Sequence, residues 1–571
     1  RMAERLGIVF TPVPVVDFTL KSADAALARH FGQRLASRDV QILDPFAGTG
    51  TFLVRLIQSG LIDAEALRHK FAHELHANEI ILLAYYIATV NIETAYHAVT
   101  GEYRPFEGMI LVDTFQMTEA GDLVDKIVLP ENNARAERQL RQPIRVIVGN
   151  PPYSAGQNSA NDNNQNLAYP TLDARIRDTY AARSSATNKN SLYDSYIRAI
   201  RWASDRIADK GIVAFVTNGS FLDGNAADGL RQCMTAEFSA LYVFNLRGNQ
   251  RTSGEQSRQE GGKIFGSGSR TPVAITILVK DPAHAGPCQL YYHDIGDSLT
   301  REDKLAIIEG FGSIEGVGWQ RFTPNAEGDW INVRNPVFET FIELGNKDNK
   351  TANTIFSIHS RGVETTRDPW VYNFSKVNVS DNTNRMIGFY NKEVSRYQKA
   401  CQNTPTPPPV EDFVGTDPKE ISWSSSLLPN VARGRQASFV HSKIVQAVYR
   451  PYCKQWLYFD GMMNHRVGQW PILFPTPEHE NIIISIIGVV ERKGFSTLVA
   501  DQLPNLHWLD TGQCFPLYWY ERLKVDQQAP QAELSFDAGE TPDADGYIRH
   551  EGITDWALET FRDRYRDQTI G

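Results

Sequence analysis

Cysteine is scarce in this sequence of 571 residues. The five cysteines lie far apart, and no two of them form a C-x-x-C pair. This scarcity argues against a zinc site and against a disulfide framework, and it predicts a reducing, cytoplasmic environment. The five are Cys233, Cys288, Cys401, Cys453 and Cys514.

Long apolar runs are also missing. The longest, residues 482–490, is interrupted by Ser485 and Gly488 and is far too short for a membrane-spanning helix. The opening residues show no basic segment followed by an apolar one, so they indicate no secretory signal. We therefore expect no membrane partner. A hydrophobic content of 42% and a charged content of 22% are typical of soluble globular proteins.

The chain lacks an excess of positive charge. Its net charge of −9 argues mildly against a nucleic-acid partner, because phosphate contacts need clustered Lys and Arg. Two stretches depart from this average: residues 247–270 are rich in Gly and basic residues, and residues 433–454 contain no acid. Each could be a solvated loop, but beside the site described below they favour DNA. The basic and aromatic residues of the second stretch are Arg433, Arg435, Lys443, Arg450 and Lys454, with Phe439, Tyr449 and Tyr452 between them.

The pattern changes along the chain. Residues 1–285 read as an α/β domain, in which residues 241–246 and 272–279 are expected to form a final antiparallel pair of strands. From residue 286, short β-like runs rich in Trp and Tyr alternate with helices, which predicts a separate α+β domain over residues 286–571. The runs are residues 289–292, 330–333, 370–373 and 457–459, and a Pro-rich linker is expected at 404–409.

The tetrapeptide Asn150-Pro151-Pro152-Tyr153 is the most informative feature that is present. It follows the apolar run 144–149, which predicts a buried strand. Two prolines remove two N–H donors and keep the backbone out of a helix. The corner therefore presents an amide oxygen, a carbonyl oxygen and an aromatic ring, which suits a planar –NH₂ group. An ordinary surface turn is the alternative, because Asn-Pro and Pro-Pro are common in loops.

A Gly-rich turn lies about a hundred residues earlier. The apolar run 40–43 is followed by Asp44-Pro45-Phe46-Ala47-Gly48-Thr49-Gly50 and then by a helical pattern over 51–59. Such a strand–turn–helix unit forms a nucleotide cradle. Leu53 stands where a dinucleotide fingerprint needs a third Gly, and the turn has no Lys for a P-loop. S-adenosylmethionine, which has an adenosine but no phosphate, fits this turn.

Two further strands are followed by acids. A strand near 71–78 leads to Glu79, which could bind ribose hydroxyls or could simply favour the start of the helix over 80–92. A strand over 108–112 leads to Asp113, which could accept from an adenine amino group or cap a loop. Three strands are thus followed by an acid, and a fourth is followed by the tetrapeptide. This ordered series indicates one site.

The sequence resembles the adenine-N6 DNA methyltransferases of the γ arrangement. In these a Thr-Pro segment, here Thr11-Pro12, comes first, then the cofactor loop, the tetrapeptide and a target-recognition region. Residues 189–196, Gly362-Val363 and residues 367–370 are similar to one branch, the type ISP (single-polypeptide type I-like) restriction-modification enzymes. Members of that branch carry a nuclease and a helicase-like motor ahead of the methyltransferase. Neither motif set occurs here, so we expect a fragment or a stand-alone relative, with fused or associated partners of those kinds.

The resemblance implies a Rossmann-like, seven-stranded methyltransferase domain that uses S-adenosyl-L-methionine and acts on double-stranded DNA. It implies that the adenine is flipped out of the duplex, that Tyr153 stacks on it, and that the Asn150 side chain and the Pro151 carbonyl accept from its amino group. We expect the cofactor site to be lined by Thr11, Pro12, Asp44, Phe46, Ala47, Gly48, Gly50, Glu79 and Asp113.

Substrate contacts are harder to assign. Phe265 could cover the second face of the base, although an apolar residue at the start of a strand explains it as well. Residues 154–166, rich in Asn and Gln, are expected to form a mobile loop that orders on substrate, or a disordered insertion. From the second basic stretch we predict DNA contacts for Arg433, Arg435, Lys443 and Arg450.

Three other activities remain open. Release-factor methyltransferases share the tetrapeptide and methylate a protein Gln amide, although they are short and lack a large β-rich half. RNA guanine-amino methylation is a second option, and a non-catalytic DNA specificity module is a third. Cytosine-C5 chemistry is disfavoured, because no Pro-Cys pair occurs in a strand-end loop before residue 286.

Overall fold

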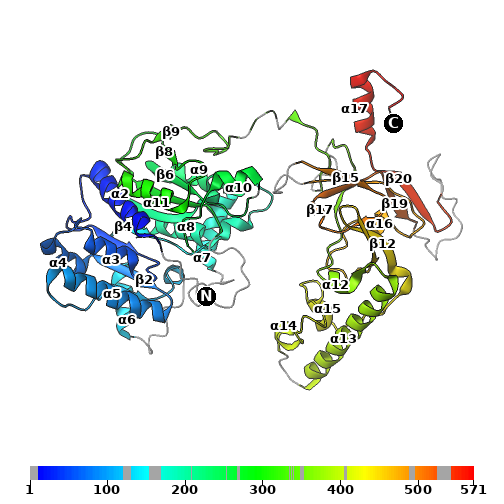
Figure 1. The fold of residues 1–571 in the computed structure, drawn as a ribbon, viewed down its shortest axis with the longest axis horizontal. Coiled ribbons are helices and arrows are strands. Elements are labelled where there is room, and N and C mark those ends of the chain that lie inside the picture. Colours follow the sequence, from blue (N-terminus) through cyan, green and yellow to red (C-terminus); the bar gives the residue numbers. More distant parts are fainter. Residues whose placement is uncertain are drawn as a thin grey trace. The chain divides into compact units, whose positions relative to one another are not determined.

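The structure is a computed structural model. It describes residues 11–119, 130–153, 169–207, 209–252, 254–266, 270–333, 335, 337, 340–347, 353–403, 408–487, 495–523 and 542–570. The predicted loop over 154–166 and most of the 404–409 linker lie outside these ranges. The chain divides into two units, residues 1–335 and 336–571, which are described separately (Figure 1).

The first unit is built on one mixed sheet of nine strands in the order β3-β2-β1-β4-β5-β7-β6-β8-β9. Neighbouring strands from β3 to β5 are parallel, and β7 is antiparallel to both β5 and β6. The strands are β1 (Gln41–Asp44), β2 (Leu75–Glu79), β3 (Met109–Leu111), β4 (Ile144–Gly149), β5 (Gly211–Asn218), β6 (Ala240–Arg247), β7 (Val273–Lys280), β8 (Gln289–Asp294) and β9 (Gln320–Phe322).

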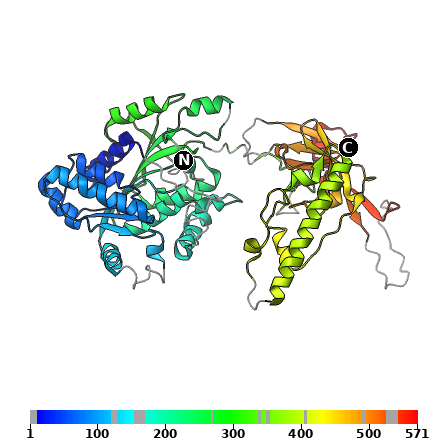
Figure 2. The same cartoon turned by 60° about the horizontal axis from the view of Figure 1, so that its bottom comes forward.

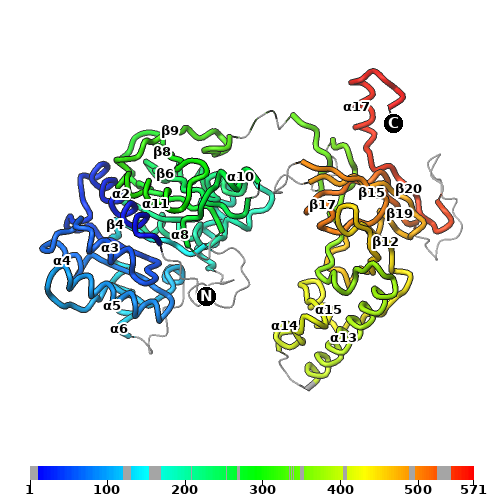
Figure 3. The backbone as a smooth tube through the Cα atoms, viewed as in Figure 1, coloured from blue at the N-terminus to red at the C-terminus, as the bar shows by residue number. Residues whose placement is uncertain are grey.

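Helices cover both faces of this sheet, as the tube in Figure 3 also shows. One apolar cluster joins the sheet to α2 (Val13–Phe31), α3 (Thr51–Gln58), α4 (Ala64–His73), α5 (Leu82–Thr100) and α11 (Arg301–Phe311). A second cluster joins the other face to α7 (Pro170–Ile176), α8 (Ser195–Arg206) and α9 (Asp228–Glu237). Because both faces are covered, all eight residues of the central strand β5 are buried. The unit also contains α6 (Pro130–Leu140) and α10 (Gly254–Glu260).

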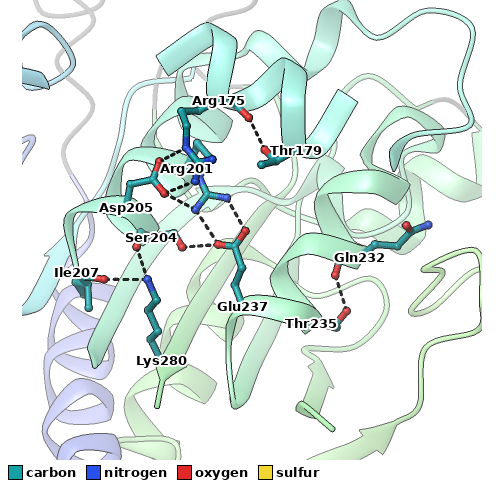
Figure 4. A network of polar contacts seen from close by, with 10 residues as sticks. All are labelled: Arg175, Thr179, Arg201, Ser204, Asp205, Ile207, Gln232, Thr235, Glu237 and Lys280. Atoms are coloured by element: carbon teal, nitrogen blue, oxygen red, sulfur yellow. Dashed lines mark hydrogen bonds and ion pairs between the residues drawn. The ribbon is translucent and has the colours of Figure 1, made fainter. Parts of the chain in front are cut away.

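A network of charged groups fixes the second layer of helices (Figure 4). The buried Arg201 of α8 donates through Nη1 to Glu237 Oε1 at 2.6 Å and through Nη2 to Asp205 Oδ1 at 2.7 Å. Lys280 Nζ on β7 donates to the carbonyls of Ser204 and Ile207, at 2.8 and 3.0 Å. These bonds tie the end of α8 to α9 and to the sheet, and so satisfy charges that would be costly to bury alone.

The predicted fold class is confirmed. Strands β3-β2-β1-β4-β5-β7-β6 form the seven-stranded arrangement, and the predicted final pair is the antiparallel pair β6 and β7. The predicted start of β2 is too early, because Phe71 belongs to α4.

The predicted domain boundary at residue 285 is wrong. Strand β8 pairs in parallel with β6, and Ile308 of α11 is buried against the same sheet. Residues 286–335 therefore complete the first unit. The aromatic run 289–292, which suggested the start of a new domain, forms β8, and β8 lies between β6 and β9 in the sheet. Residues 330–333 form no strand, and Trp330 packs in the second cluster of this unit.

The second unit combines small sheets with helices around one large apolar cluster, beside which Val448, Ala500 and Trp508 form a small one. Its sheets have the orders β10-β18-β14-β15, β11-β13-β12-β16 and β19-β20. The 28-residue helix α13 (Lys376–Asn403) is prominent in Figure 2. The strands are β10 (Ser360–Arg361), β11 (Tyr372–Asn373), β12 (Ile444–Arg450), β13 (Cys453–Tyr458), β14 (Ile483–Ile486), β15 (Thr497–Ala500), β16 (Leu503–Pro504), β17 (Trp508–Thr511), β18 (Gln513–Pro516), β19 (Tyr518–Arg522) and β20 (Tyr547–Glu551).

The remaining helices of this unit are short, apart from the last. They are α12 (Asp368–Val371), α14 (Val410–Phe413), α15 (Leu428–Ala432), α16 (Trp470–Leu473) and α17 (Asp555–Tyr565). The predicted α+β character is confirmed, although Trp370 and Val371 of the expected run 370–373 belong to α12. Across the described ranges of both units, no helix has the length and apolarity needed to cross a bilayer.

Candidate active site at the carboxyl edge of the first sheet

Two neighbouring parallel strands bring the Gly-rich turn after β1 and the tetrapeptide together. Because β1 and β4 are parallel, Asp44 at the end of β1 and Asn150 directly after β4 emerge at the same edge. Gly149 permits their close approach, since a Cβ added there would lie 3.0 Å from Asp44 Oδ1. The sequence prediction of a single site at this edge therefore agrees with the sheet topology.

The amide of Asn150 is held at both of its ends. Its Nδ2 donates to Thr11 Oγ1 at 2.9 Å, and its Oδ1 accepts from the Tyr153 hydroxyl at 2.6 Å. The same hydroxyl lies 3.0 Å from the carbonyl oxygen of Val216, at the end of β5. Pro151 is buried and Pro152 is exposed, so the corner is anchored in the fold while its outer side reaches solvent.

The ring of Tyr153 is half-buried among other aromatic rings. Its centroid lies 6.1 Å from that of Phe265 and 6.4 Å from that of Tyr196. Burial, with a contribution from the Asp194 carboxylate, raises the pKa of Tyr153 well above its usual value, so the phenol keeps its proton and acts as a donor. Phe265 is 1% exposed and supports the Tyr153 ring. Its predicted contact with a base stays a prediction, and it requires the two rings to part.

The turn after β1 has the left-handed backbone that its glycines permit. Gly48 has φ 55° and Gly50 has φ 83°. Nothing lies within 4 Å of a Cβ added to Gly48, so the turn is open there, whereas one added to Gly50 would meet Ile92 of α5 at 3.1 Å. The Ala47 N–H donates to the Asn78 carbonyl, and the half-buried Phe46 ring packs against Phe115.

Asp44 is fully buried and only half satisfied. Its Oδ1 accepts from the Phe46 N–H at 3.1 Å, but its Oδ2 has no hydrogen-bond partner among the described residues. Burial, and to a lesser extent the nearby charge of Glu79, raises the pKa of Asp44 to about 8. An orphaned carboxylate oxygen of this kind is suited to a cationic or hydrogen-bond-donating ligand.

Glu79 and Asp113 lie at the ends of the adjacent strands β2 and β3. Glu79 accepts from the N–H groups of Gly48 and Ile81, at 2.8 and 2.7 Å, so it ties the cofactor turn to the start of α5. Asp113 accepts from the Phe115 N–H at 2.9 Å and from the Tyr169 hydroxyl at 2.8 Å. Burial raises the pKa of both acids. Each carboxylate retains lone pairs that could accept from a ligand.

Sequence reasoning missed three parts of this site. The Val216 carbonyl comes from a strand whose sequence shows only burial, and Tyr196 ends the segment 189–196, whose family resemblance gave this ring no role. Tyr169 follows the segment 154–168, and nothing in its neighbourhood marks it as a partner of Asp113. Thr11 was predicted from the Thr-Pro segment, but its bond to Asn150 spans 139 positions and has no sequence signal. Pro12, its neighbour, is half-buried and caps α2.

The basic residues predicted to contact substrate differ in their availability. In the first stretch, Arg247 is neutralised by Asp294 and Asp297. In the second unit, Lys443 pairs with Asp460 at 2.6 Å, and Arg450 donates to Asn505 Oδ1 at 2.8 Å. Arg433 and Arg435 are exposed, and within the described ranges neither has a carboxylate at ion-pair distance.

Comparison with protein families assigns both units. A model of the Eco57I restriction-modification methylase matches residues 99–251, and a model of the Type ISP C-terminal specificity domain matches residues 354–571. The sequence has no match among curated proteins.

Three solved structures are similar along almost the whole chain. A nuclease-deletion mutant of the Type ISP restriction-modification enzyme LlaGI, in complex with a DNA substrate mimic, is 42% identical with a TM-score of 0.84, over 98% of this chain and 44% of that chain. The ATP-dependent Type ISP enzyme LlaBIII bound to DNA is 38% identical, with a TM-score of 0.84, over 97% of this chain and 35% of that chain. A DrdV–DNA complex is 34% identical, with a TM-score of 0.85, over 100% of this chain and 53% of that chain.

The sequence given therefore spans between about a third and about a half of the lengths of these relatives. The chain belongs to the Type ISP restriction-modification enzymes and carries their methylase and specificity domains.

Proposed function

We propose that this chain transfers a methyl group from S-adenosylmethionine to the N6 amino group of an adenine flipped out of double-stranded DNA. The observation that carries the proposal is the Asn150 amide. Its nitrogen is held by Thr11, and its oxygen accepts a hydrogen bond at the corner where β1 and β4 end. An acceptor fixed in this way is complementary to a planar –NH₂ group.

The residues at the edge fit the cofactor. The turn is open above Gly48. Asp44 Oδ2, which has no hydrogen-bond partner among the residues described, can accept from the α-ammonium group of the methionine part. We assign Glu79 to the ribose hydroxyls and Asp113 to the adenine amino group. When bound, S-adenosylmethionine supplies an activated methyl group on a positively charged sulfur.

The chain positions and polarises the target nitrogen. Asn150 Oδ1 and the Pro151 carbonyl accept from its two hydrogens, which directs the nitrogen lone pair outward for transfer. These oxygens also stabilise the positive charge that develops on the nitrogen, a fixed electrostatic contribution that needs no prior proton transfer. In the structure the Tyr153 hydroxyl occupies Asn150 Oδ1, so the entering amino group must replace it.

Tyr153 then offers its ring to the flipped base. Flipping costs a few kcal/mol, and stacking on an aromatic ring recovers roughly 1–3 kcal/mol. Because Phe265 lies behind Tyr153, we infer that it limits how far this ring can retreat.

The second unit is proposed to select the DNA sequence. Its match to a specificity domain and the DNA-bound state of the three similar structures support this assignment. We also propose that the full-length protein carries or recruits nuclease and helicase-like domains, because one relative was studied as a nuclease-deletion mutant and another is ATP-dependent.

Labelled methyl transfer to plasmid DNA tests the proposal, with the methylated base identified as N6-methyladenine. Asn150→Ala is expected to abolish transfer while its affinity for S-adenosylmethionine stays within a few-fold of wild type. Label appearing in protein Gln or in RNA instead of DNA would overturn the substrate assignment. Full activity of Asn150→Ala would overturn the mechanism.

A further inference from the structure

The turn of the hairpin formed by β12 and β13 contains a residue with an unfavourable backbone conformation. Arg450 pairs with Cys453, so the turn consists of Pro451 and Tyr452. Tyr452 is 95% exposed and has φ 60°. This left-handed conformation is unfavourable for a bulky residue other than glycine, and such strain is retained chiefly at functional sites. The turn therefore holds an aromatic ring in solvent at the expense of folding stability.

The same end of this sheet carries further aromatic and basic side chains. Asn373 of β11 pairs with Trp456 of β13, so the residues that follow β11 run toward the turn. Phe374 is 73% exposed, and Lys376 Nζ lies 5.0 Å from the centroid of the Trp456 ring. Arg450 stacks on Tyr449 at 4.0 Å. We define Phe374, Lys376, Arg450, Tyr452 and Lys454 as the hairpin-tip surface.

The acids near this surface lie at the long end of ion-pair distance from its cations. Arg450 lies 4.0 Å from Asp368, and Lys454 lies 3.6 Å from the exposed Asp501. By contrast, Lys443 and Asp460 are 2.6 Å apart. Arg450 is also kept in place by its bond to Asn505 rather than by a full charge partner. The cations at the tip therefore retain charge that can be directed at an anionic partner.

We propose that the hairpin-tip surface is a contact for double-stranded DNA, in which the Tyr452 ring packs against base or sugar edges and the flanking cations contact phosphates. The proposal deepens the proposed function and depends on it. Duplex DNA combines closely spaced phosphates with apolar base and sugar edges, which matches the alternation of cations and exposed rings at the tip. A protein partner would not require cations on both sides of the ring.

Opposite effects on stability and on binding distinguish this role from a structural one. Tyr452→Gly relieves the backbone conformation, so we expect the melting temperature to rise or stay unchanged. The same variant should bind DNA about tenfold more weakly, because it loses a stacking or edge contact. Tyr452→Phe should bind like wild type. The probe is a labelled duplex that carries the sequence mapped from methylation, with a scrambled duplex beside it.

Two further variants sharpen the test. Lys454→Gln should weaken binding to both duplexes. It should also reduce the slope of log K against log salt concentration by about one, which corresponds to one phosphate contact. Tyr565→Ala, which removes another exposed Tyr on α17, serves as the matched control and should bind like wild type. If wild type binds DNA and Tyr452→Gly binds equally well, or if Tyr452→Gly is destabilised, the inference is overturned. If wild type binds no DNA, the proposed function fails with it.

Discussion

The two units place their functional groups in opposite environments. In the first unit Asp44 is 0% exposed and Asn150 is held by two side-chain hydrogen bonds, whereas in the second unit Tyr452 is 95% exposed. Positioning and polarising an amino group requires fixed dipoles away from water, where their field is strong. Contact with a large anionic partner requires reach and unneutralised charge. In this protein, the residues proposed for the chemistry are buried or fixed by hydrogen bonds, and the residue proposed for DNA contact is exposed.

The largest effect is expected at Tyr153, where two variants separate the role of the ring from that of the hydroxyl. Tyr153→Ala removes a stack worth roughly 1–3 kcal/mol, so we expect methyl transfer to fall by up to about two orders of magnitude. Tyr153→Phe keeps the ring and frees Asn150 Oδ1 from its internal partner, so activity should stay within about fivefold of wild type. Initial rates at saturating cofactor measure both. Equal losses in the two variants would show that the hydroxyl, not the ring, is required.

A smaller effect is expected at Thr11, which we interpret as a positioning residue for Asn150. Thr11→Val keeps the shape but removes the acceptor of Asn150 Nδ2, and the amide can then turn its nitrogen toward the Tyr153 oxygen. We expect kcat to fall about tenfold, as for a lost hydrogen bond to a buried group, with little change in KM for DNA. Thr11→Ser keeps the hydroxyl and should retain activity. A Thr11→Ser variant as impaired as Thr11→Val would contradict this role.

The pH dependence of stability tests the burial of Asp44. Its pKa is raised from 3.8 to about 8, so between these values the cofactor-free folded protein binds more protons than the unfolded chain. The stability that this proton provides is present at low pH and is lost as the pH rises toward about 8. The melting temperature of Asp44→Asn should therefore fall less than that of wild type between about pH 5 and about pH 9. Identical profiles would show that Asp44 ionises freely.

Cofactor binding should show the complementary dependence. An ionised Asp44 favours a cationic group, so the affinity of wild type for S-adenosylmethionine should increase as the pH rises through about 8. Titration calorimetry at several pH values measures this, and Asn at position 44 should remove the dependence.

The smallest effect is expected among the exposed cations of the second unit. Arg433→Gln and Arg435→Gln remove charges without a carboxylate at ion-pair distance in the described ranges, and each should reduce the salt slope of DNA binding by about one. Lys443→Gln removes a charge already paired with Asp460 and should have a smaller effect. The reverse order would show that ion pairing within the unit does not determine which cations meet DNA.

The fold of the first unit could be predicted in most of its parts, since its parallel strands are buried on both faces and appear as continuous apolar runs. Strands β1 and β4 and the pair of β6 and β7 were found in this way. The boundary predicted at residue 285 was wrong because β8 is rich in aromatic residues, and its pairing with β6 and β9 leaves no local signal in the sequence. The second unit could be predicted only as α+β, because its short strands pair across long intervals.

The series of strand-end motifs can be read from local sequence alone, because prolines, glycines and acids constrain the backbone wherever they occur. From that series follow the edge of the sheet that carries the site and the chemistry proposed for it. Three features depend on tertiary packing: Thr11 holds the Asn150 amide, Asp44 Oδ2 has no partner within the part of the chain that the structure describes, and Arg247 is neutralised. Hydrogen bonds, burial and ion pairs depend on distances between residues far apart in the chain, and these distances are set by packing rather than by local sequence.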